Sequence, residues 1–187
     1  MGQTEEGKPQ GLMVVVKWIQ KIDEAILAIL NRKSERKILQ PLMSFLSHPP
    51  HWRELALIIL LAVLLFGSAQ ARWRTGYLLL TVVLSDQTCN LLKALVKRVR
   101  PDGLRNINGS FWRRLGYYSF PSSHAANTFA AAYLFSQWWP TLTVPAYLAA
   151  ALISFSRIYR NNHYPSDVLA GGLIGLGYAC LVLKYIL

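Results

Sequence analysis

Hydrophobic residues occur along this chain in long blocks rather than in an alternating pattern. The blocks are Leu55–Ala71, Tyr77–Leu84, Ala125–Trp139, Leu142–Phe155 and Val168–Leu187. A helix that crosses a bilayer needs about 20 mostly apolar residues, or somewhat fewer where flanking side chains reach the interface. The pattern therefore predicts an all-α, polytopic transmembrane helix bundle of five to six spans, with residues 1–187 forming a single domain.

Residues 53–187 are expected to form the helical core with five spans. Prolines and polar breaks place them at Leu55–Ala71, Tyr77–Lys97, Ser122–Trp139, Leu142–Tyr159 and Pro165–Leu187. The second span ends before Pro101, because a residue that precedes proline disfavours helix. In the last span, Gly171 and Gly175 form a face of small residues that favours close helix packing.

Residues 1–52 are expected to form an interfacial segment instead. The apolar stretch Leu12–Leu30 carries four charges near its middle: Lys17, Lys21, Asp23 and Glu24. Each charge at mid-membrane costs at least about 2.5 kcal/mol, so an amphipathic helix that lies in the interface is favoured over a span. The stretch Leu39–Phe45 is too short to cross, and Ser47–Trp52 contains a Pro-Pro pair that is typical of a loop.

Following the predicted helices across the membrane brings four helix ends to one face. These ends carry Lys93, Lys97 and Arg100 (second span), Ser122, Ser123 and His124 (third), Ser156 and Arg157 (fourth), and His163 and Asp167 (fifth). The opposite face receives only Arg72, Arg74 and Lys184. The cationic, hydroxyl and histidine side chains are thus expected to gather on a single membrane surface.

This set of side chains suits a phosphate monoester. Lys93, Arg100 and Arg157 can neutralise its charge, and each arginine can bind two of its oxygens. Ser122 and Ser123 stand at a helix N-terminus, where unpaired backbone N–H groups favour an anion.

Two histidines supply candidate catalytic groups. His163 precedes Asp167 by four residues, so a carboxylate bonded to one ring nitrogen can fix the tautomer and leave the other nitrogen free to attack. His124 comes from a different helix and can protonate the leaving oxygen, a transfer typically worth about 10²–10⁴ in rate. The sequence therefore predicts a nucleophile and an acid at one site.

The formal charge of +11 is compatible with nucleic acid, anionic lipid headgroups or a phosphorylated substrate. Helices buried in lipid, and the absence of an aromatic-rich basic strand or a Cys/His finger spacing, argue against nucleic acid. The basic residues outside the motifs are assigned to headgroups or water: Lys97, Arg98, Arg113, Arg114 and Arg160.

Three other polar residues are not assigned to the site. His48 and His51 stand three apart, but no nearby acid or cysteine completes a metal site, so a loop is expected there. Asp86 either holds the bundle together or orients a cation, and the sequence leaves both readings open.

Three motifs resemble the type 2 phosphatidic acid phosphatase family, whose site is shared with vanadium haloperoxidases and glucose-6-phosphatase. They are Lys93-(six residues)-Arg100-Pro101, then Pro121-Ser122-Ser123-His124, then Ser156-Arg157-(five residues)-His163-(three residues)-Asp167. The motifs appear in order with matching internal spacing, and the resemblance covers roughly Tyr77–Leu187.

The resemblance implies a phosphatase that works without metal or another cofactor. It implies that His163 becomes phosphorylated, that Asp167 supports it, and that His124 is the general acid. The implied phosphate ligands are Lys93, Arg100, Arg157, Ser122 and the backbone of Ser123. Ser123 stands where the family commonly has glycine, but its backbone N–H is still available.

The resemblance also implies a membrane lipid as substrate and the bacterial cytoplasmic membrane as location. Bacterial relatives dephosphorylate undecaprenyl diphosphate, phosphatidylglycerol phosphate or the 1-position of lipid A, mostly on the extracytoplasmic face. The positive-inside rule conflicts with that face here, but substrate binding accounts for three of the charges. Members usually have six spans, and in this chain the first is either shortened or replaced by the interfacial helix.

Two alternatives from other classes remain open at this stage. A non-catalytic lipid-binding or scrambling protein would keep the cations but would not need His124 or a His163–Asp167 pair. A vanadate-dependent peroxidase would use a similar site, although membrane spans argue against it. The sequence does not predict an oligomeric state.

Overall fold

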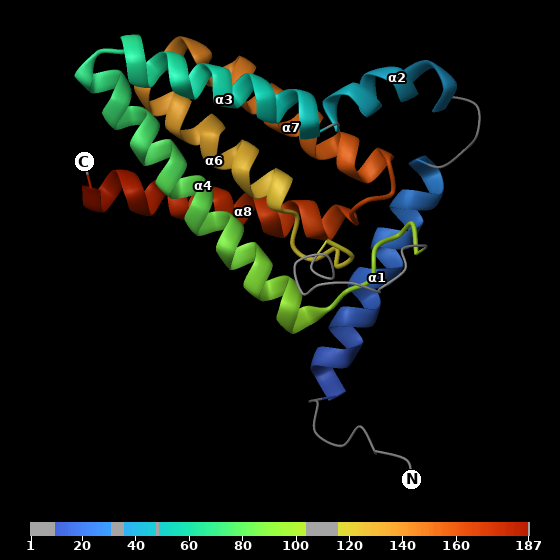
Figure 1. Ribbon diagram of the computed structural model, residues 1–187. Coiled ribbons are helices and arrows are strands. Elements are labelled where there is room, and N and C mark those ends of the chain that lie inside the picture. Colours follow the sequence, from blue (N-terminus) through green and yellow to red (C-terminus); the bar gives the residue numbers. More distant parts are fainter. Residues whose placement is uncertain (1–9, 31–35, 48, 104–115, 187) are drawn as a thin grey trace.

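The computed structural model describes the chain except for residues 1–9, 31–35, 48, 104–115 and 187 (Figure 1). The α-helices of the described part are α1 (Gln10–Leu30), α2 (Arg36–Leu46), α3 (Pro49–Phe66), α4 (Ala69–Val96), α6 (Ser123–Trp138), α7 (Thr143–Tyr159) and α8 (Pro165–Ile186). A 3₁₀ turn, Pro140–Leu142, precedes α7, and Val99 forms an isolated bridge with Tyr118. The predicted all-α class is confirmed.

Helix α6 forms the centre of the bundle and packs against α4, α7 and α8 (Figure 1). Alanines on α6, including Ala125, Ala126 and Ala130, are fully buried, and Leu134 packs with Ala130 and Ala179 in the core. Short side chains allow neighbouring helix backbones to approach closely. The central helix can therefore carry a site residue that three other helices surround.

Two of the four glycines of α8, Gly171 and Gly175, lie directly against the backbone of α6. A Cβ atom placed on Gly175 would lie 1.9 Å from the carbonyl oxygen of Ala126, and one on Gly171 would lie 2.2 Å from that of Ser122. Neither position has room for a side chain, so the predicted small-residue packing face is confirmed. As a result, the first turns of α6 lie directly on the first turns of α8.

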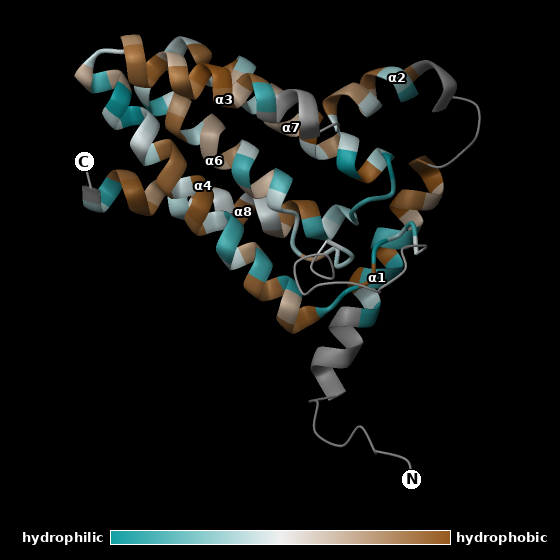
Figure 2. Cartoon of the chain, viewed as in Figure 1, coloured by the Kyte–Doolittle hydropathy of each residue, from teal (hydrophilic) through white to brown (hydrophobic). Residues whose placement is uncertain are grey.

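Within the described residues, three helices are long and apolar enough to cross a membrane: Ala69–Val96, Pro140–Tyr159 and Pro165–Tyr185. Large apolar side chains such as Leu57, Leu95 and Leu169 are exposed. Hydrophobic residues, brown in Figure 2, recur along the helices of the bundle. Apolar side chains exposed in this way are stable in lipid. The apolar part of α3, Glu54–Phe66, is shorter, and α6 has 16 residues, so the fuller count of five to six spans stays a prediction.

The predicted start of the first span at Leu55 agrees with the apolar part of α3, which begins at Glu54, but the predicted end of the span and the predicted loop before it are wrong. The expected loop at Ser47–Trp52 is interrupted because α3 begins at Pro49, and proline is tolerated in a first helical turn. The span also does not continue to Ala71, because α3 ends at Phe66 and α4 begins at Ala69. Ser68 caps α4 by accepting a hydrogen bond from the Ala71 N–H at 3.2 Å, so Arg72–Arg74 belong to α4.

The amphipathic helix predicted at Leu12–Leu30 is present as α1, although its place in the interface stays a prediction. Lys17, Lys21 and Glu24 are exposed, but Asp23 is only 2% exposed. Helix α1 packs against α7 and α8, so one of its four central charges faces the bundle rather than water or headgroups.

Candidate active site

The C-terminal ends of α4 and α7 and the N-terminal ends of α6 and α8 gather in one region (Figure 1). Two hydrogen bonds cross between them. Lys93 Nζ donates to Ser123 Oγ at 2.6 Å, and the Ser122 N–H donates to the Asp167 backbone carbonyl at 2.9 Å. The structure therefore brings together residues from all three sequence motifs.

Ser122 caps the start of α6. Its hydroxyl accepts a hydrogen bond from the Ala125 N–H at 3.4 Å, and the side chain is fully buried. Ser123 is the first residue of the helix and His124 the second. The capped terminus presents backbone N–H groups beside Lys93, an arrangement that favours an anion.

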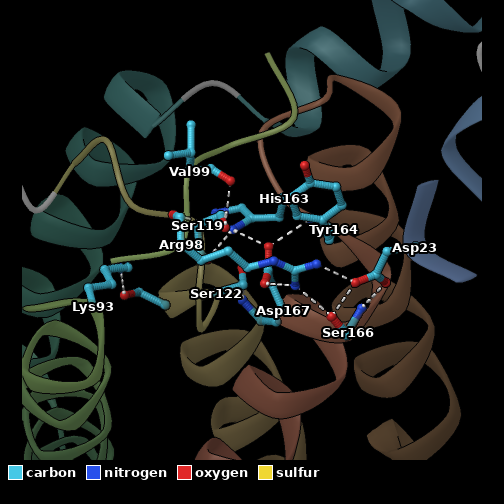
Figure 3. Close-up of polar contacts among 12 residues, drawn as sticks. Asp23, Lys93, Arg98, Val99, Ser119, Ser122, His163, Tyr164, Ser166 and Asp167 are labelled. Carbon is cyan, nitrogen blue, oxygen red and sulfur yellow. Dashed lines mark hydrogen bonds and ion pairs between the residues drawn. The ribbon is translucent and has the colours of Figure 1, made fainter. Parts of the chain in front are cut away.

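His163 lies in the turn between α7 and α8 and is 2% exposed. Its Nδ1 atom is 2.7 Å from the backbone carbonyl oxygen of Ser119 (Figure 3). Because a carbonyl oxygen can only accept, Nδ1 carries the hydrogen and Nε2 keeps its lone pair. The main chain thus fixes the tautomer in which Nε2 can act as a nucleophile.

The predicted hydrogen bond between His163 and Asp167 is absent at this geometry. Their nearest atoms, Nδ1 and Oδ2, are 3.9 Å apart, beyond hydrogen-bond distance. Oδ2 instead accepts from the Tyr164 N–H at 2.8 Å. The sequence analysis missed Ser119, because a contact made through a backbone carbonyl leaves no signal in residue type.

Three cations surround the two histidines. Lys93, Arg100 and Arg157 lie close enough to act electrostatically on both His124 and His163. Burial, followed by the charges of Arg100 and Arg157, lowers the pKa of His163 well below its ordinary value, against the opposing effect of the Ser119 carbonyl. His163 is therefore neutral near pH 7.

Arg157 also connects the site to α2. Its NH1 group donates to the Ser47 carbonyl oxygen at 3.0 Å, and the Ser47 and Ser156 hydroxyls are 2.8 Å apart. All three residues are buried. Ser47, which the sequence analysis placed in a loop, thus helps to orient a motif arginine.

The assignment of Arg98 to headgroups or water is wrong. Its side chain is only 17% exposed and forms ion pairs with two carboxylates, Asp23 at 2.6 Å and Asp167 at 2.7 Å (Figure 3). The sequence held one clue to this pairing: an aspartate in the middle of an amphipathic helix needs a partner if it faces the bundle.

The other polar residues take no part in these hydrogen bonds and ion pairs. Lys97 and Arg160 are exposed, whereas Asp86 accepts a hydrogen bond from Asn90 at 3.1 Å along α4. Arg113, Arg114 and His48 lie outside the described residues, as does the side chain of His51. Among the residues that the structure does describe, no three His, Cys, Asp or Glu side chains cluster in a way that could hold a metal ion.

A match to a known family shows which family the chain belongs to. Residues 74–187, more than half of the chain, match the PAP2 superfamily. The chain belongs to the PAP2 superfamily. The match contains every motif residue singled out above, whereas Asp23 lies outside it.

Curated relatives of this PAP2 protein include several lipid phosphatases. It is 40% identical over 109 residues to a lipid A 4'-phosphatase of Bacteroides thetaiotaomicron, which covers 51% of this chain and 46% of the relative. It is 33% identical over 113 residues to a lipid A 1-phosphatase of Rhizobium johnstonii, covering 58% and 46%. The match thus spans about half the length of these relatives.

Solved structures share the fold more fully. A PAP2-type phosphatidylglycerolphosphate phosphatase from Bacillus subtilis aligns with a TM-score of 0.65 and 25% identity, over 90% of this chain and 86% of that one. Aquifex aeolicus LpxE aligns with a TM-score of 0.66 and 23% identity, over 88% and 96%. This PAP2 protein is therefore an integral membrane protein with several apolar helices.

Proposed function

We propose that this PAP2 protein is a lipid phosphatase that hydrolyses a phosphate monoester or diphosphate of a membrane lipid through a phosphohistidine at His163. The observation that carries the proposal is the 2.7 Å contact between His163 Nδ1 and the Ser119 carbonyl. That contact leaves Nε2 unprotonated beside three cations, which is what attack on a bound phosphate requires.

In the first step, His163 Nε2 forms a bond to phosphorus while the bond from phosphorus to the lipid oxygen breaks. His124 gives its proton to that leaving oxygen. The bound phosphate brings negative charge next to His124, which favours the protonated form that this step needs.

In the second step, water attacks the phosphohistidine. His124, now neutral, takes a proton from the water as the new P–O bond forms and the P–N bond breaks. Inorganic phosphate leaves, and both histidines return to their starting protonation states. Apart from the substrate and one water molecule, no group outside the chain is needed to balance the two steps.

Lys93, Arg100 and Arg157 are proposed to hold the phosphate oxygens, together with the Ser122 hydroxyl and the Ser123 backbone. Charge spreads over these oxygens in the transition state, so preorganised cations there lower the barrier. Burial of Lys93 and Arg157 strengthens this interaction, because little water is present to screen it.

The proposed substrates are lipid A 1-phosphate, undecaprenyl diphosphate and phosphatidylglycerol phosphate. Relatives named for such lipids support this set: lipid A phosphatases, phosphatidylglycerophosphatase B of Bacillus subtilis and an undecaprenyl-diphosphatase of Sulfolobus acidocaldarius. A panel of these three lipids, assayed for phosphate release in mixed micelles, would rank them by kcat/KM.

We further propose a single membrane phosphatase domain in the bacterial cytoplasmic membrane, with its site on the extracytoplasmic face and five to six spans. The gathering of the motif residues at one end of the bundle supports a site at a membrane surface. Reaction of single cysteines placed at Lys97 and at Arg74, using a membrane-impermeant thiol reagent on intact cells, would test the orientation.

The deciding experiment is the His163→Gln variant, which keeps the side-chain size and removes the nucleophile. We expect loss of phosphate release and loss of acid-labile phosphate on the protein, with unchanged melting temperature in detergent. Phosphate release at the wild-type rate in this variant would refute the nucleophile. A wild-type protein that binds lipid phosphates without releasing phosphate would favour the lipid-binding alternative, and halogenation with added vanadate would favour the peroxidase.

A further inference from the structure

Helix α1 reaches the site through Gln20, whose Oε1 accepts a hydrogen bond from Arg98 NH2 at 2.5 Å, and through one buried carboxylate. Asp23 is 2% exposed, although it belongs to a helix whose neighbouring charges, Lys21 and Glu24, are exposed. A carboxylate buried to this degree is stable only when it is paired and hydrogen-bonded. The partners of Asp23 therefore show what α1 contributes to the molecule.

One set of partners lies at the start of α8. Asp23 Oδ1 accepts from the Ser166 N–H at 3.0 Å, and Oδ2 accepts from the Ser166 hydroxyl at 2.5 Å. Ser166 is the second residue of α8, where N–H groups lack partners within the helix. Asp23 thus caps the helix that begins two residues after His163, from a position 143 residues earlier in the chain.

The other partner is Arg98, which follows α4. Arg98 NH2 contacts Asp23 Oδ2 at 2.6 Å, and NH1 contacts Asp167 Oδ1 at 2.7 Å. The guanidinium carbon also lies 3.9 Å from the centre of the Tyr164 ring, which fixes the plane of the group. One guanidinium therefore joins α1 to Asp167, the acid of the third motif (Figure 3).

The orientation of Asp167 depends on how Arg98 divides its charge. With Oδ1 held by Arg98, Oδ2 points to the Tyr164 N–H and lies 3.9 Å from His163 Nδ1. Arg98 has two carboxylate partners here, Asp23 and Asp167. If Asp23 lost its charge, Asp167 would be the one that remains. Arg98 would then draw Asp167 toward itself and away from the turn that carries His163.

We propose that Asp23 is a positioning residue of the active site, which acts through Arg98 and Ser166 to hold Asp167 and the His163 turn in the geometry for phosphoryl transfer. The proposal rests on the proposed function for its kinetic consequence. Asp23 does not touch the phosphate site, so its effect falls on the transition state rather than on ground-state binding. Helix α1 then helps to position the active-site residues, although the PAP2 match begins only at residue 74.

The test compares Asp23→Asn with Glu24→Gln, an equal loss of charge at the adjacent, exposed position of α1. For Asp23→Asn we expect kcat to fall about tenfold or more with KM within about twofold, whereas Glu24→Gln leaves both within about twofold. Unchanged kcat in a folded Asp23→Asn variant would overturn the proposal, as would an equal loss in Glu24→Gln.

A binding measurement separates positioning from simple loss of folded protein. Vanadate mimics the phosphoryl-transfer transition state and sulfate a bound ground-state anion, so titration calorimetry of both in detergent reports each contribution. Asp23→Asn should weaken vanadate binding about tenfold or more and leave sulfate binding within about twofold. An equal loss of affinity for vanadate and sulfate, or no loss of affinity for either, would contradict a positioning role.

Arg98→Lys provides a second variant in case Asp23→Asn does not fold. Lysine keeps the charge but cannot span both carboxylates, so the same selective loss of vanadate affinity is expected. Combining the two substitutions should cost much less than the product of their separate effects, because both remove one contact. If the wild type binds vanadate but hydrolyses no lipid phosphate, the proposed function fails. The vanadate affinities of the variants would still test whether Asp23 positions the site.

Discussion

The two sides of His163 use the same residue types in opposite ways. On the phosphate side, Lys93, Arg100 and Arg157 all oppose a positive charge on the imidazole. On the supporting side, Arg98 is held between two carboxylates, Asp23 and Asp167. The first side concentrates like charge, whereas the second balances one cation against two anions.

This difference separates binding from support. Like charges held close together repel one another, and a dianionic phosphate relieves that repulsion when it binds. A guanidinium that is already shared by two carboxylates has little to gain from another anion. Arg98 is thus marked as a supporting residue by its two carboxylate partners, Asp23 and Asp167, rather than by its residue type or its distance from the motif.

The largest effect is expected from removing a cation on the phosphate side. Lys93→Met should lower kcat/KM by about 10²–10³, the usual loss when one preorganised donor to a transition-state oxygen is deleted. Lys97→Met makes the same change at an exposed position one turn further on and should leave kcat/KM unchanged. Phosphate release from a short-chain lipid phosphate measures both, and equal losses would show that overall charge, not position, matters.

The next largest effect disturbs both sides together, because it separates α6 from α8. Gly175→Ala places a Cβ where the Ala126 carbonyl oxygen is 1.9 Å away, and overpacking of this kind costs about 1–3 kcal/mol. Gly177→Ala, with no heavy atom within 4 Å of its new Cβ, should instead be neutral or slightly stabilising. Melting temperatures in detergent would compare the two, and similar values would contradict the packing argument.

The sequence predicted the phosphate side far better than the supporting side. Lys93, Arg100, Arg157 and both histidines are recognisable because their side-chain chemistry and spacing carry the signal. The limits of α6, α7 and α8 were predicted to within a few residues, because a proline or a polar break marks them, as at Pro165.

The supporting side was missed for three physical reasons. Ser119 acts through its carbonyl oxygen, which every residue has. Asp23 and Arg98 lie 75 residues apart, and either alone resembles an interfacial charge. The break between α3 and α4 falls inside an apolar run, where only Gly67 and Ser68 mark it. Each of these features depends on which segments meet in space, and composition does not record that.

A smaller effect is expected at Ser166, within the supporting side. Its hydroxyl accepts from Arg98 at 2.7 Å and donates to Asp23, but the Ser166 N–H contact to Asp23 does not need the side chain. Ser166→Ala should therefore cost about 1 kcal/mol in transition-state stabilisation, roughly fivefold in kcat. A loss as great as that from Asp23→Asn would place the supporting role in the hydroxyl rather than in the carboxylate.

The smallest effect is expected in the pH dependence of kcat/KM, which reports the protonation of His163. Its folded-state pKa lies well below 6.5, so the imidazole stays neutral where an ordinary histidine gains a proton as pH falls. With an aryl phosphate, whose leaving group needs no proton from His124, we expect kcat/KM, divided by the fraction of dianionic substrate from a phosphorus NMR titration, to stay flat from about pH 7.5 down to about pH 6 and to fall only at lower pH. Arg100→Gln removes one cause of the lowered pKa, so its acid limb should move to higher pH. If the acid limb instead stays in place, Arg100 serves the substrate without tuning the nucleophile.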